Sequence, residues 1–255
     1  MGFLGGGSSS TEQSTYYVER VSTGVIGLDD KIEGGLVKGS VNLVVGKAGT
    51  GKTQFCSSFI YAGAKNGEPG LYITTEEAVD AIKEDIRAMF NWDFNEMENL
   101  GLIRFVSIKP VIPDKSTTMD VTMVTRSYIL NVINKISVAV KELGAKRLVI
   151  DSISVLEMFI DDKYLARVAL MNLTDKLRQL GVTTVMSGEI PETSEGLSGS
   201  GIIEYLVDSV IKLDFVPVSE EFKRTLTIRK MRRTNHSTLI HPFEITREGM
   251  KLIEI

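Results

Sequence analysis

A short glycine-rich stretch carries the residues of this sequence that are best suited to chemistry. Residues 46–53 read Gly-Lys-Ala-Gly-Thr-Gly-Lys-Thr, so that four residues separate Gly46 from Gly51, and Lys52 and Thr53 follow at once. Glycine is costly to order, so three of them between an apolar run and an amphipathic segment indicate a backbone shaped around a bound group. Consecutive backbone N–H groups at the start of a helix attract anions. The spacing therefore predicts a phosphate-binding loop.

The side chains of this loop have definite expected roles. Lys52 is expected to reach the β- and γ-phosphates of a nucleotide, and the Thr53 hydroxyl is expected to bind Mg²⁺. The alternative is a glycine-rich turn that binds nothing, but the strand expected before the loop and the helix expected after it favour the phosphate site. The residues expected to contact the nucleotide are Gly46, Lys47, Ala48, Gly49, Thr50, Gly51, Lys52, Thr53 and Gln54.

Acidic residues follow two other apolar runs. Asp151 ends the run at 147–151, where a carboxylate beside a phosphate loop would hold Mg²⁺ through a bound water. Glu76 and Glu77 follow a second run, where a carboxylate can orient an attacking water and accept its proton. The alternative is that these glutamates only complement the dipole of a helix over 76–90. That alternative fits Glu77, which we expect just inside the helix, better than Glu76.

The elements that must position these residues alternate along the chain. We expect strands at 41–45, 70–75, 102–108, 147–151 and 183–188, and helices at 52–65, 76–90, 122–143 and 163–180. Strands that alternate with helices imply parallel pairing, with helices on both faces of the sheet. From about residue 208, four strand-like segments follow one another without helices and predict antiparallel strands along one edge. The predicted fold class is therefore α/β, with a mainly parallel sheet extended by C-terminal antiparallel strands.

Composition indicates one large globular domain. The chain has 255 residues, of which 43% are hydrophobic, and this is near the size at which a single core stops growing. We expect one domain over 16–255, and we interpret the Gly- and Ser-rich residues 1–15 as a flexible tail or an artificial remnant. The segment 109–124, with two prolines and a charged tip, is expected to be a surface loop.

Charge and cysteine content exclude several classes of protein. The formal net charge of −4 excludes a polycation that coats nucleic acid through bulk charge. The single cysteine, Cys56, excludes an internal disulfide, and we expect it to be a buried core thiol. No apolar run approaches the length of a membrane span and no secretory signal is visible, so we expect no membrane association and a cytoplasmic location.

Several stretches together carry a family resemblance. The segment from Ser22 to Thr53, the run Tyr-Ile-Thr-Thr-Glu-Glu at 72–77, the run Leu-Val-Ile-Asp-Ser-Ile-Ser at 148–154, and the C-terminal Lys-Met-Arg-Arg-Thr-Asn-His at 230–236 resemble the RecA superfamily. The glutamate pair and the C-terminal motif are typical of its KaiC-like branch, which includes archaeal RadA paralogues with a single such domain. The resemblance covers about residues 20 to 255.

This resemblance implies a Mg²⁺-dependent ATPase with a RecA-like fold. Glu76 would be the principal base that activates water, with Glu77 in support. Lys230 and Arg232 would reach the γ-phosphate bound to a neighbouring subunit, so the protein would form a homo-oligomer, often a ring or hexamer in relatives. The alternative from the residues alone is that the strand around Lys230 and Arg232 is a solvated basic strand.

Three functions agree with these features. The first is a DNA-repair ATPase, a RadA paralogue that binds single-stranded DNA and assists a RadA-type recombinase in homologous recombination. Its support is the flexible loop 188–201, which follows a strand but contains three glutamates and no basic residue. Basic groups would then come from Lys109, Lys115, Arg126 or Lys163. The second is a regulatory or signalling ATPase that acts through protein partners without DNA, which the acidic charge favours. The third is a kinase, for which no acceptor pocket is visible.

Overall fold

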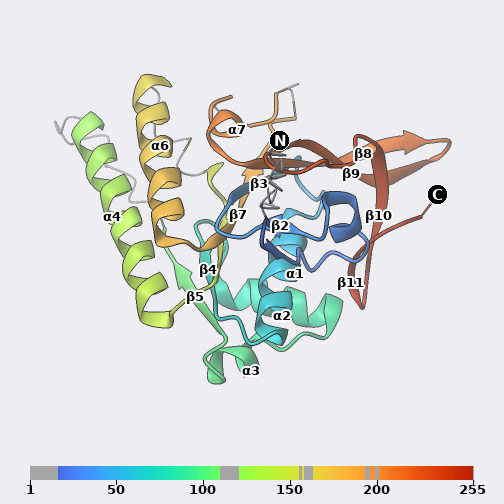
Figure 1. Cartoon of the computed structure of the whole chain (residues 1–255), viewed down its shortest axis with the longest axis horizontal. Coiled ribbons are helices and arrows are strands. Elements are labelled where there is room, and N and C mark those ends of the chain that lie inside the picture. Colours follow the sequence, from blue (N-terminus) through green and yellow to red (C-terminus); the bar gives the residue numbers. More distant parts are fainter. Residues whose placement is uncertain are drawn as a thin grey trace, which may run out of the picture.

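A nine-stranded sheet forms the centre of the protein (Figure 1). The computed structural model describes residues 17–109, 121–154, 157, 163–192, 196–198 and 201–254. The strand order is β11-β10-β9-β8-β3-β7-β6-β4-β5. The strands are β3 (Val41–Gly46), β4 (Gly70–Thr74), β5 (Ile103–Ser107), β6 (Arg147–Asp151), β7 (Thr183–Glu189), β8 (Ser209–Val218), β9 (Glu221–Met231), β10 (Ile240–Thr246) and β11 (Gly249–Leu252). The six strands from β8 to β5 are parallel, and β9, β10 and β11 are antiparallel.

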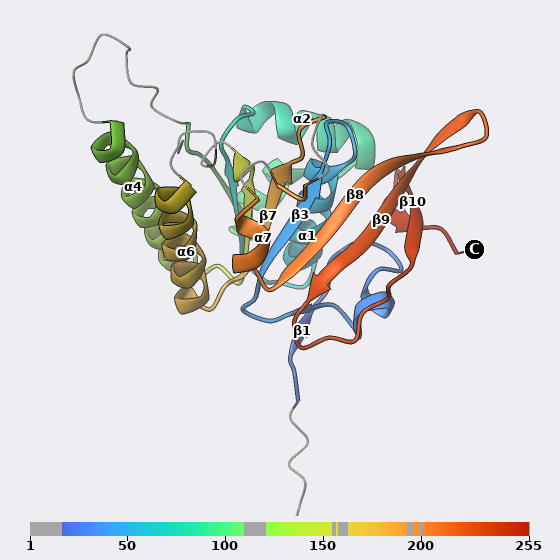
Figure 2. The same ribbon diagram turned by 90° about the horizontal axis from the view of Figure 1, so that it is seen from above.

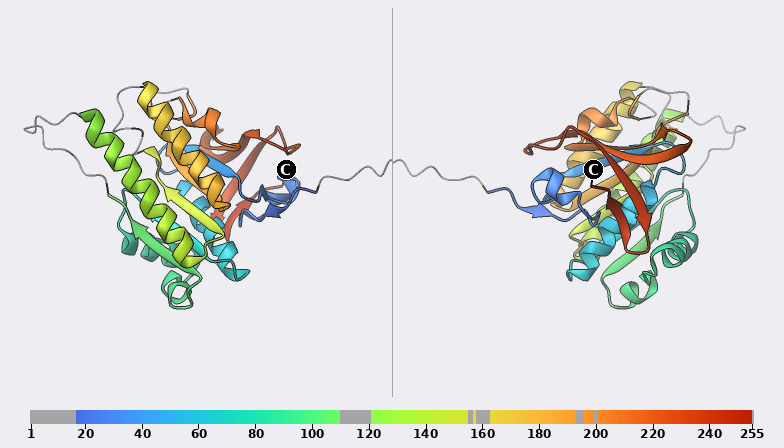
Figure 3. Two further views of the ribbon diagram at one scale, coloured as in Figure 1. Left: turned by 60° about the vertical axis from the view of Figure 1, so that its left-hand side comes forward. Right: turned by 90° about the vertical axis from the view of Figure 1, so that its right-hand side faces the viewer.

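Helices cover both faces of the sheet, as Figures 2 and 3 show. One face carries α1 (Lys52–Lys65), α2 (Val79–Phe90) and α3 (Phe94–Asn99), and the other carries α4 (Val121–Leu143), α6 (Lys163–Leu180) and α7 (Ile203–Leu206). Alternate residues of β3 point to opposite faces of the sheet: Leu43 and Val45 pack on the α4 and α6 side, and Val44 packs on the α1 side. The central strands are therefore buried on both faces, as parallel strands require.

The lead-in to the sheet is anchored on α1. It contains β1 (Arg20–Val21), the 3-10 helix η1 (Asp29–Ile32) and β2 (Leu36–Val37). Arg147, whose side chain is 1% exposed, donates hydrogen bonds to the carbonyls of Ser22 and Phe59, both at 2.8 Å, and pairs with Glu68 at 2.7 Å. A buried charge is tolerated only when it is paired and hydrogen-bonded in this way. Arg147 therefore joins the start of β6 to the lead-in and to the helix that follows the phosphate loop.

Most predicted elements are present, and three details of the prediction are wrong. Strand β8 is parallel to β3 and antiparallel only to β9, so the antiparallel extension begins one strand later than predicted. Helix α2 begins at Val79, because Glu76 and Glu77 belong to the turn after β4. Helix α4 begins at Val121, which removes 121–124 from the predicted surface loop.

Other predictions concern residues outside the described part of the chain, the cysteine and membrane association. The predicted tail at 1–15, Lys115 and the rest of the surface loop after Lys109 lie outside the described residues. Cys56 is buried in α1, and burial raises the pKa of its thiol well above the ordinary value, as expected of a core residue. Within the described part of the chain, no helix is both long and apolar enough to cross a membrane.

Two glycines with the same backbone conformation offer a test of the packing on α1. Gly24 has φ 74° and Gly67 has φ 72°. A Cβ at Gly24 would lie 2.1 Å from the backbone oxygen of Ser58, whereas a Cβ at Gly67 would meet nothing within 4 Å. We expect Gly67→Ala to lower the free energy of unfolding by about 1–2 kcal/mol, the cost of left-handed backbone strain, and Gly24→Ala to lower it by more than about 3 kcal/mol.

Urea unfolding of the two variants beside the unsubstituted protein measures this difference. Equal losses of stability would contradict the close contact between the lead-in and α1.

Candidate active site

The predicted phosphate loop connects β3 to α1 at the carboxyl edge of the parallel strands. A Cβ at Gly46 would lie 2.5 Å from Thr50 Oγ1 and 2.7 Å from the backbone oxygen of Leu213, so only glycine fits there. Gly51 caps α1 with φ 110°, a conformation that also requires glycine. The loop is thus folded back on itself before α1 begins, which leaves the first N–H groups of the helix available for an anion.

Lys52 lies across the mouth of this loop. Its Nζ donates hydrogen bonds to the carbonyls of Gly46 and Lys47, both at 2.9 Å. Burial lowers the pKa of the Lys52 ammonium, and the carboxylates of Glu189 and Asp151 oppose that shift. The lysine is therefore held beside the loop, where it can exchange backbone carbonyls for phosphate oxygens.

Asp151 is held by hydrogen bonds from both neighbouring strands. The Tyr72 hydroxyl of β4 donates to Asp151 Oδ2 at 2.7 Å, and the Ser187 hydroxyl of β7 donates to Oδ1. Burial raises the pKa of the Tyr72 phenol well above its ordinary value, and Asp151 raises it further, so the phenol keeps its proton and donates a hydrogen bond. Tyr72 is fully buried, and no local pattern in the sequence indicates its bond to Asp151. Ser187 lies inside a strand and carries no motif signal.

Glu76 and Glu77 stand at the end of β4, beside Asp151. Ser152 Oγ donates to Glu76 Oε1 at 2.6 Å, and Thr74 Oγ1 donates to the Glu77 carbonyl at 2.8 Å. Burial raises the pKa of the Glu77 carboxyl, and the negative charges of Asp151, Asp85 and Glu76 raise it further. Both glutamates precede α2, so Glu77 does not lie just inside the helix as expected.

A cavity of about 300 Å³ joins these groups. Its lining residues are Ala48, Gly49, Gly51, Lys52, Thr53, Gln54, Glu76, Glu77, Asp85, Ile86, Asp151, Ser152 and Glu189. Of these described residues, five are acidic and one is basic. Sequence reasoning missed Glu189 as a site residue, although its position at the end of β7 could have indicated it. Gly46, Lys47 and Thr50 shape the loop but do not line this cavity, and Lys47 pairs with Glu192 at 3.0 Å.

The donor set fits a magnesium ion that is shared with a nucleotide. Thr53 supplies a hydroxyl and Asp151 a carboxylate to the same cavity. Among the described residues, no group of three or more His, Cys, Asp or Glu side chains could hold a metal by itself. Mg²⁺ differs from metals held in all-protein cages, because it keeps several waters and binds through one or two protein groups together with phosphates.

Lys230 and Arg232 lie at the opposite edge of the sheet. Lys230 is opposite Val210 in β8, Met231 is opposite Ser209, and Ser209 is paired with Asn42 at the start of β3. The phosphate loop follows the other end of β3, and a six-residue strand places its two ends roughly 17 Å apart. Lys230 and Arg232 are therefore too far from the phosphate loop of their own chain to act on a nucleotide bound there.

These two basic residues have different surroundings. The Arg232 side chain is 55% exposed, and its Nη1 is 3.9 Å from Asp208 Oδ1. Asp208 is 11% exposed, and its Oδ2 accepts hydrogen bonds from the Val41 backbone at 2.9 Å and from Arg178 Nε at 3.3 Å. Lys230 is instead turned toward backbone carbonyls of its own chain. Arg232 thus lies at the surface beside Asp208, which is held in place by its own hydrogen bonds. The interpretation as a solvated basic strand did not predict this acidic partner.

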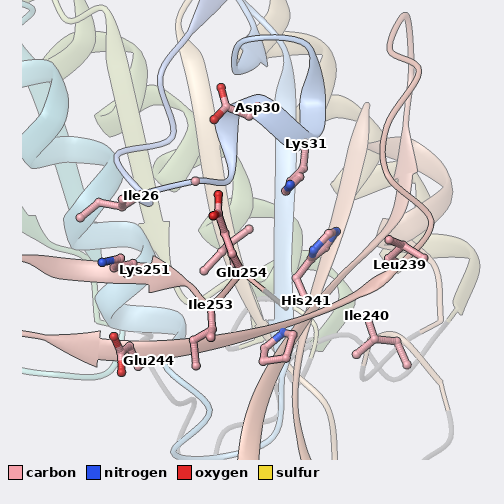
Figure 4. Close-up of a pocket in the computed structure, with 13 residues that line it drawn as sticks. Ile26, Asp30, Lys31, Leu239, Ile240, His241, Glu244, Lys251, Ile253 and Glu254 are labelled. Atoms are coloured by element: carbon pink, nitrogen blue, oxygen red, sulfur yellow. The ribbon is translucent and has the colours of Figure 1, made fainter.

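A second and larger cavity, of about 610 Å³, lies away from the phosphate loop (Figure 4). Asp30 and Lys31 of η1 lie on one side of it, and His241 and Glu244 of β10 lie on the other. Four partly exposed aliphatic side chains also line it: Ile26, Leu239, Ile240 and Ile253. Its charges are mixed, and it shares no lining residue with the first cavity.

Comparisons with known proteins agree with this geometry. The family model described as "ATPase: KaiC" matches residues 21–255. A UPF0273 protein of Methanopyrus kandleri is 37% identical over 241 residues, which cover 92% of each chain. The circadian clock protein KaiC3 of Synechocystis is 33% identical over 96% of this chain, but the match covers only 47% of that longer protein. The solved structure of a KaiC-like protein from Pyrococcus horikoshii has a TM-score of 0.80 at 37% identity, and the match covers 93% of this chain and all of that one.

The two glutamates can be distinguished by matched substitutions. We expect Glu76→Gln to keep nucleotide affinity and to lose at least about a hundredfold in turnover, because the amide can hold a water but cannot accept its proton. Glu77→Gln is the control, since it removes the neighbouring carboxylate with the same change in shape, and we expect a smaller loss. Single-turnover hydrolysis and fluorescent-nucleotide binding measure the two quantities. A slower Glu77→Gln variant would reverse the assignment of the base.

Proposed function

We propose, from the premise that this chain belongs to the KaiC family of ATPases, that it hydrolyses ATP in the presence of Mg²⁺ at sites shared between identical subunits. The observation that carries this proposal is the separation of the phosphate loop from Lys230 and Arg232 by the length of β3. If both sets of residues act on one nucleotide, two chains must supply them.

The first half of the proposed site lies at the carboxyl edge. The N–H groups of residues 46–54 and the Lys52 ammonium would hold the triphosphate, and Thr53 and Asp151 would hold Mg²⁺. The ion, when bound, would neutralise charge on the phosphate oxygens. Glu76, oriented by Ser152, would accept the proton of the attacking water. Glu77 would support it in the same acidic group.

The second half of the proposed site comes from the neighbouring subunit. Arg232 and Lys230 of that subunit would stabilise the negative charge that develops on the transferred phosphoryl group. Such contacts between unlike edges of identical chains are heterologous, and they close into a ring when the rotation between subunits allows it. We therefore propose a homo-oligomeric ring, with a hexamer as one form.

We propose that the output of the ATPase passes through protein partners, as a regulatory ATPase. The acidic net charge and the acidic residues of the loop after β7 support this, and so do the relatives that are named as circadian clock proteins.

A RadA paralogue that binds single-stranded DNA is the second candidate. Its specific support is the exposed lysines at 109 and 163, which lie at the end of β5 and at the start of α6. Arg126 lies in α4, but its side chain is outside the described residues.

Mixing two inactive variants tests the shared site. Glu76→Gln alone should be nearly inactive, and so should Arg232→Ala alone, because an arginine of this kind contributes about a thousandfold or more to turnover. If subunits exchange at random, roughly a quarter of interfaces would join an intact Glu76 to an intact Arg232, by simple counting. We therefore expect the mixture to regain activity that neither component has, measured as phosphate release.

The control is Arg233→Ala, which removes a neighbouring arginine and should stay active by itself. Native mass measurements report whether subunits have exchanged. A mixture that has exchanged and is still inactive would show that Arg232 does not act across the interface.

Titration with a labelled single-stranded oligonucleotide at two salt concentrations distinguishes the two candidate functions, a regulatory ATPase and a RadA paralogue that binds DNA. Phosphate contacts make affinity fall steeply with salt. For a partner-directed ATPase we expect no saturable binding at either salt concentration and no stimulation of ATP turnover by the oligonucleotide. Saturable, salt-sensitive binding that is weakened by Lys109→Ala and Lys163→Ala would instead favour the RadA paralogue.

A further inference from the structure

Lys230 is held by the short helix α7 of its own chain. Its Nζ donates hydrogen bonds to the carbonyls of Val207 at 2.6 Å and Glu204 at 3.0 Å, with a longer contact to Tyr205 at 3.5 Å. An ammonium group has three N–H donors. All three are therefore directed to the end of α7, and none is left for a ligand in another subunit while these bonds last.

The carboxyl end of α7 depends on basic side chains. The last carbonyls of a helix have no partners inside the helix, and they attract cations. Arg178 Nη2 donates to the Leu206 carbonyl at 2.6 Å, so the four carbonyls from 204 to 207 are all capped by Lys230 or Arg178. A helix of four residues is too short to be stable by itself. Ile203 and Val207 anchor α7 in the core, and Lys230 caps most of the carbonyls at its exposed carboxyl end.

The segment that ends in α7 begins at the nucleotide cavity of the same chain. Glu189 lines that cavity, the N–H of Ile190 donates to the Gly46 carbonyl at 3.2 Å, and Glu192 pairs with Lys47 at 3.0 Å. Near the other end, Ser198 Oγ donates to Glu204 Oε2 at 2.7 Å. The described residues at the start of this segment thus lie on the phosphate loop, and those at its end lie against Lys230; residues 193–195 and 199–200 are outside the described part of the chain.

The same ammonium cannot serve α7 and a triphosphate in the neighbouring subunit at once. On the function proposed above, we propose that α7 is a latch on Lys230. A triphosphate bound by the neighbouring subunit draws Lys230 away from the carbonyls of residues 204–207, and the end of α7 is released. The nucleotide state of one subunit is thereby passed to α7 of the next subunit.

The direction of this change follows from the surroundings of Lys230. Burial lowers the pKa of its ammonium and Arg232 lowers it further, with Asp208 opposing the shift. The ammonium is thus partly desolvated already, and a phosphate offers it full negative charge where α7 offers only carbonyl dipoles. Arg178 keeps its own bonds to Leu206 and Asp208, so α7 is loosened at one side and not detached.

A single tryptophan can report on α7. The chain has one tryptophan, Trp92, so the Trp92→Phe and Tyr205→Trp changes leave one indole in α7, where Tyr205 is 67% exposed. Adding Lys52→Ala to this reporter chain removes its own nucleotide binding. The reporter chain is then mixed with Trp92→Phe chains that keep Lys52 and can bind nucleotide. We expect a non-hydrolysable ATP analogue with Mg²⁺ to shift the emission maximum of the reporter in this mixture and not in the reporter chain alone.

Two further variants of the reporter chain make the test specific. Lys230→Met, which keeps the length of the side chain without its charge, should abolish the shift. Lys223→Met, on the exposed opposite end of the same strand, should keep it. Persistence of the shift with Lys230→Met, or its appearance in the reporter chain alone, would overturn the latch.

Together with the mixing experiment on Glu76→Gln and Arg232→Ala, the reporter distinguishes failure of the latch from failure of the shared active site. If the mixture of Glu76→Gln and Arg232→Ala regains activity but the reporter shows no shift, the latch is wrong and the shared site stands. If exchanged subunits show neither rescue nor shift, the proposed function fails and the latch fails with it.

Discussion

The carboxylate of Asp151 lies where three neighbouring strands meet, and the site depends on the hydrogen bonds that hold it there. Tyr72 and Ser187 reach it from β4 and β7, on either side of β6. A charged group so close to the core is stable only when its oxygens are hydrogen-bonded. The register of the parallel strands supplies these partners, because Thr74 is opposite Asp151 and Met186 is opposite Ile150. A slip by one residue would turn Asp151 to the other face of the sheet.

The sequence was sufficient to predict the parallel core and the phosphate loop, because both follow from local patterns. Apolar runs, helical periodicity and glycine spacing are properties of neighbouring residues, and they located β6 and α6 to the residue. Partners from distant strands have no such local signal. The bond from Tyr72 to Asp151 joins residues 79 positions apart, and the bonds from Lys230 to α7 span more than twenty. The direction of β8 was missed for the same reason, since it is set by pairing with β3 and not by its own residues.

The strand β3 separates the phosphate loop from the basic residues Lys230 and Arg232. Its carboxyl end leads into the phosphate loop, and its amino end is bonded to Asp208, which lies beside Arg232. Both faces of β3 are buried, so its side chains are closely packed against both helical layers. Outside the sheet, described residues that follow β7 lie near both ends of β3: Glu189 lines the cavity at the phosphate loop, and the Val207 carbonyl accepts a hydrogen bond from Lys230.

Charge in the cavity provides a physical reason for linking nucleotide binding to assembly. Five carboxylates and a single lysine line the described cavity, and a triphosphate adds further negative charge. Like charges in a partly desolvated site repel, so the five carboxylates oppose a triphosphate there, and positive charge near the phosphates would reduce this repulsion. On the proposed arrangement, Lys230 and Arg232 of the neighbouring chain supply the missing positive charge. Because such coupling is reciprocal, the nucleotide then stabilises the interface by the same free energy by which the interface stabilises the nucleotide. On that arrangement, the excess of acid in the cavity would favour the assembled state when nucleotide is bound.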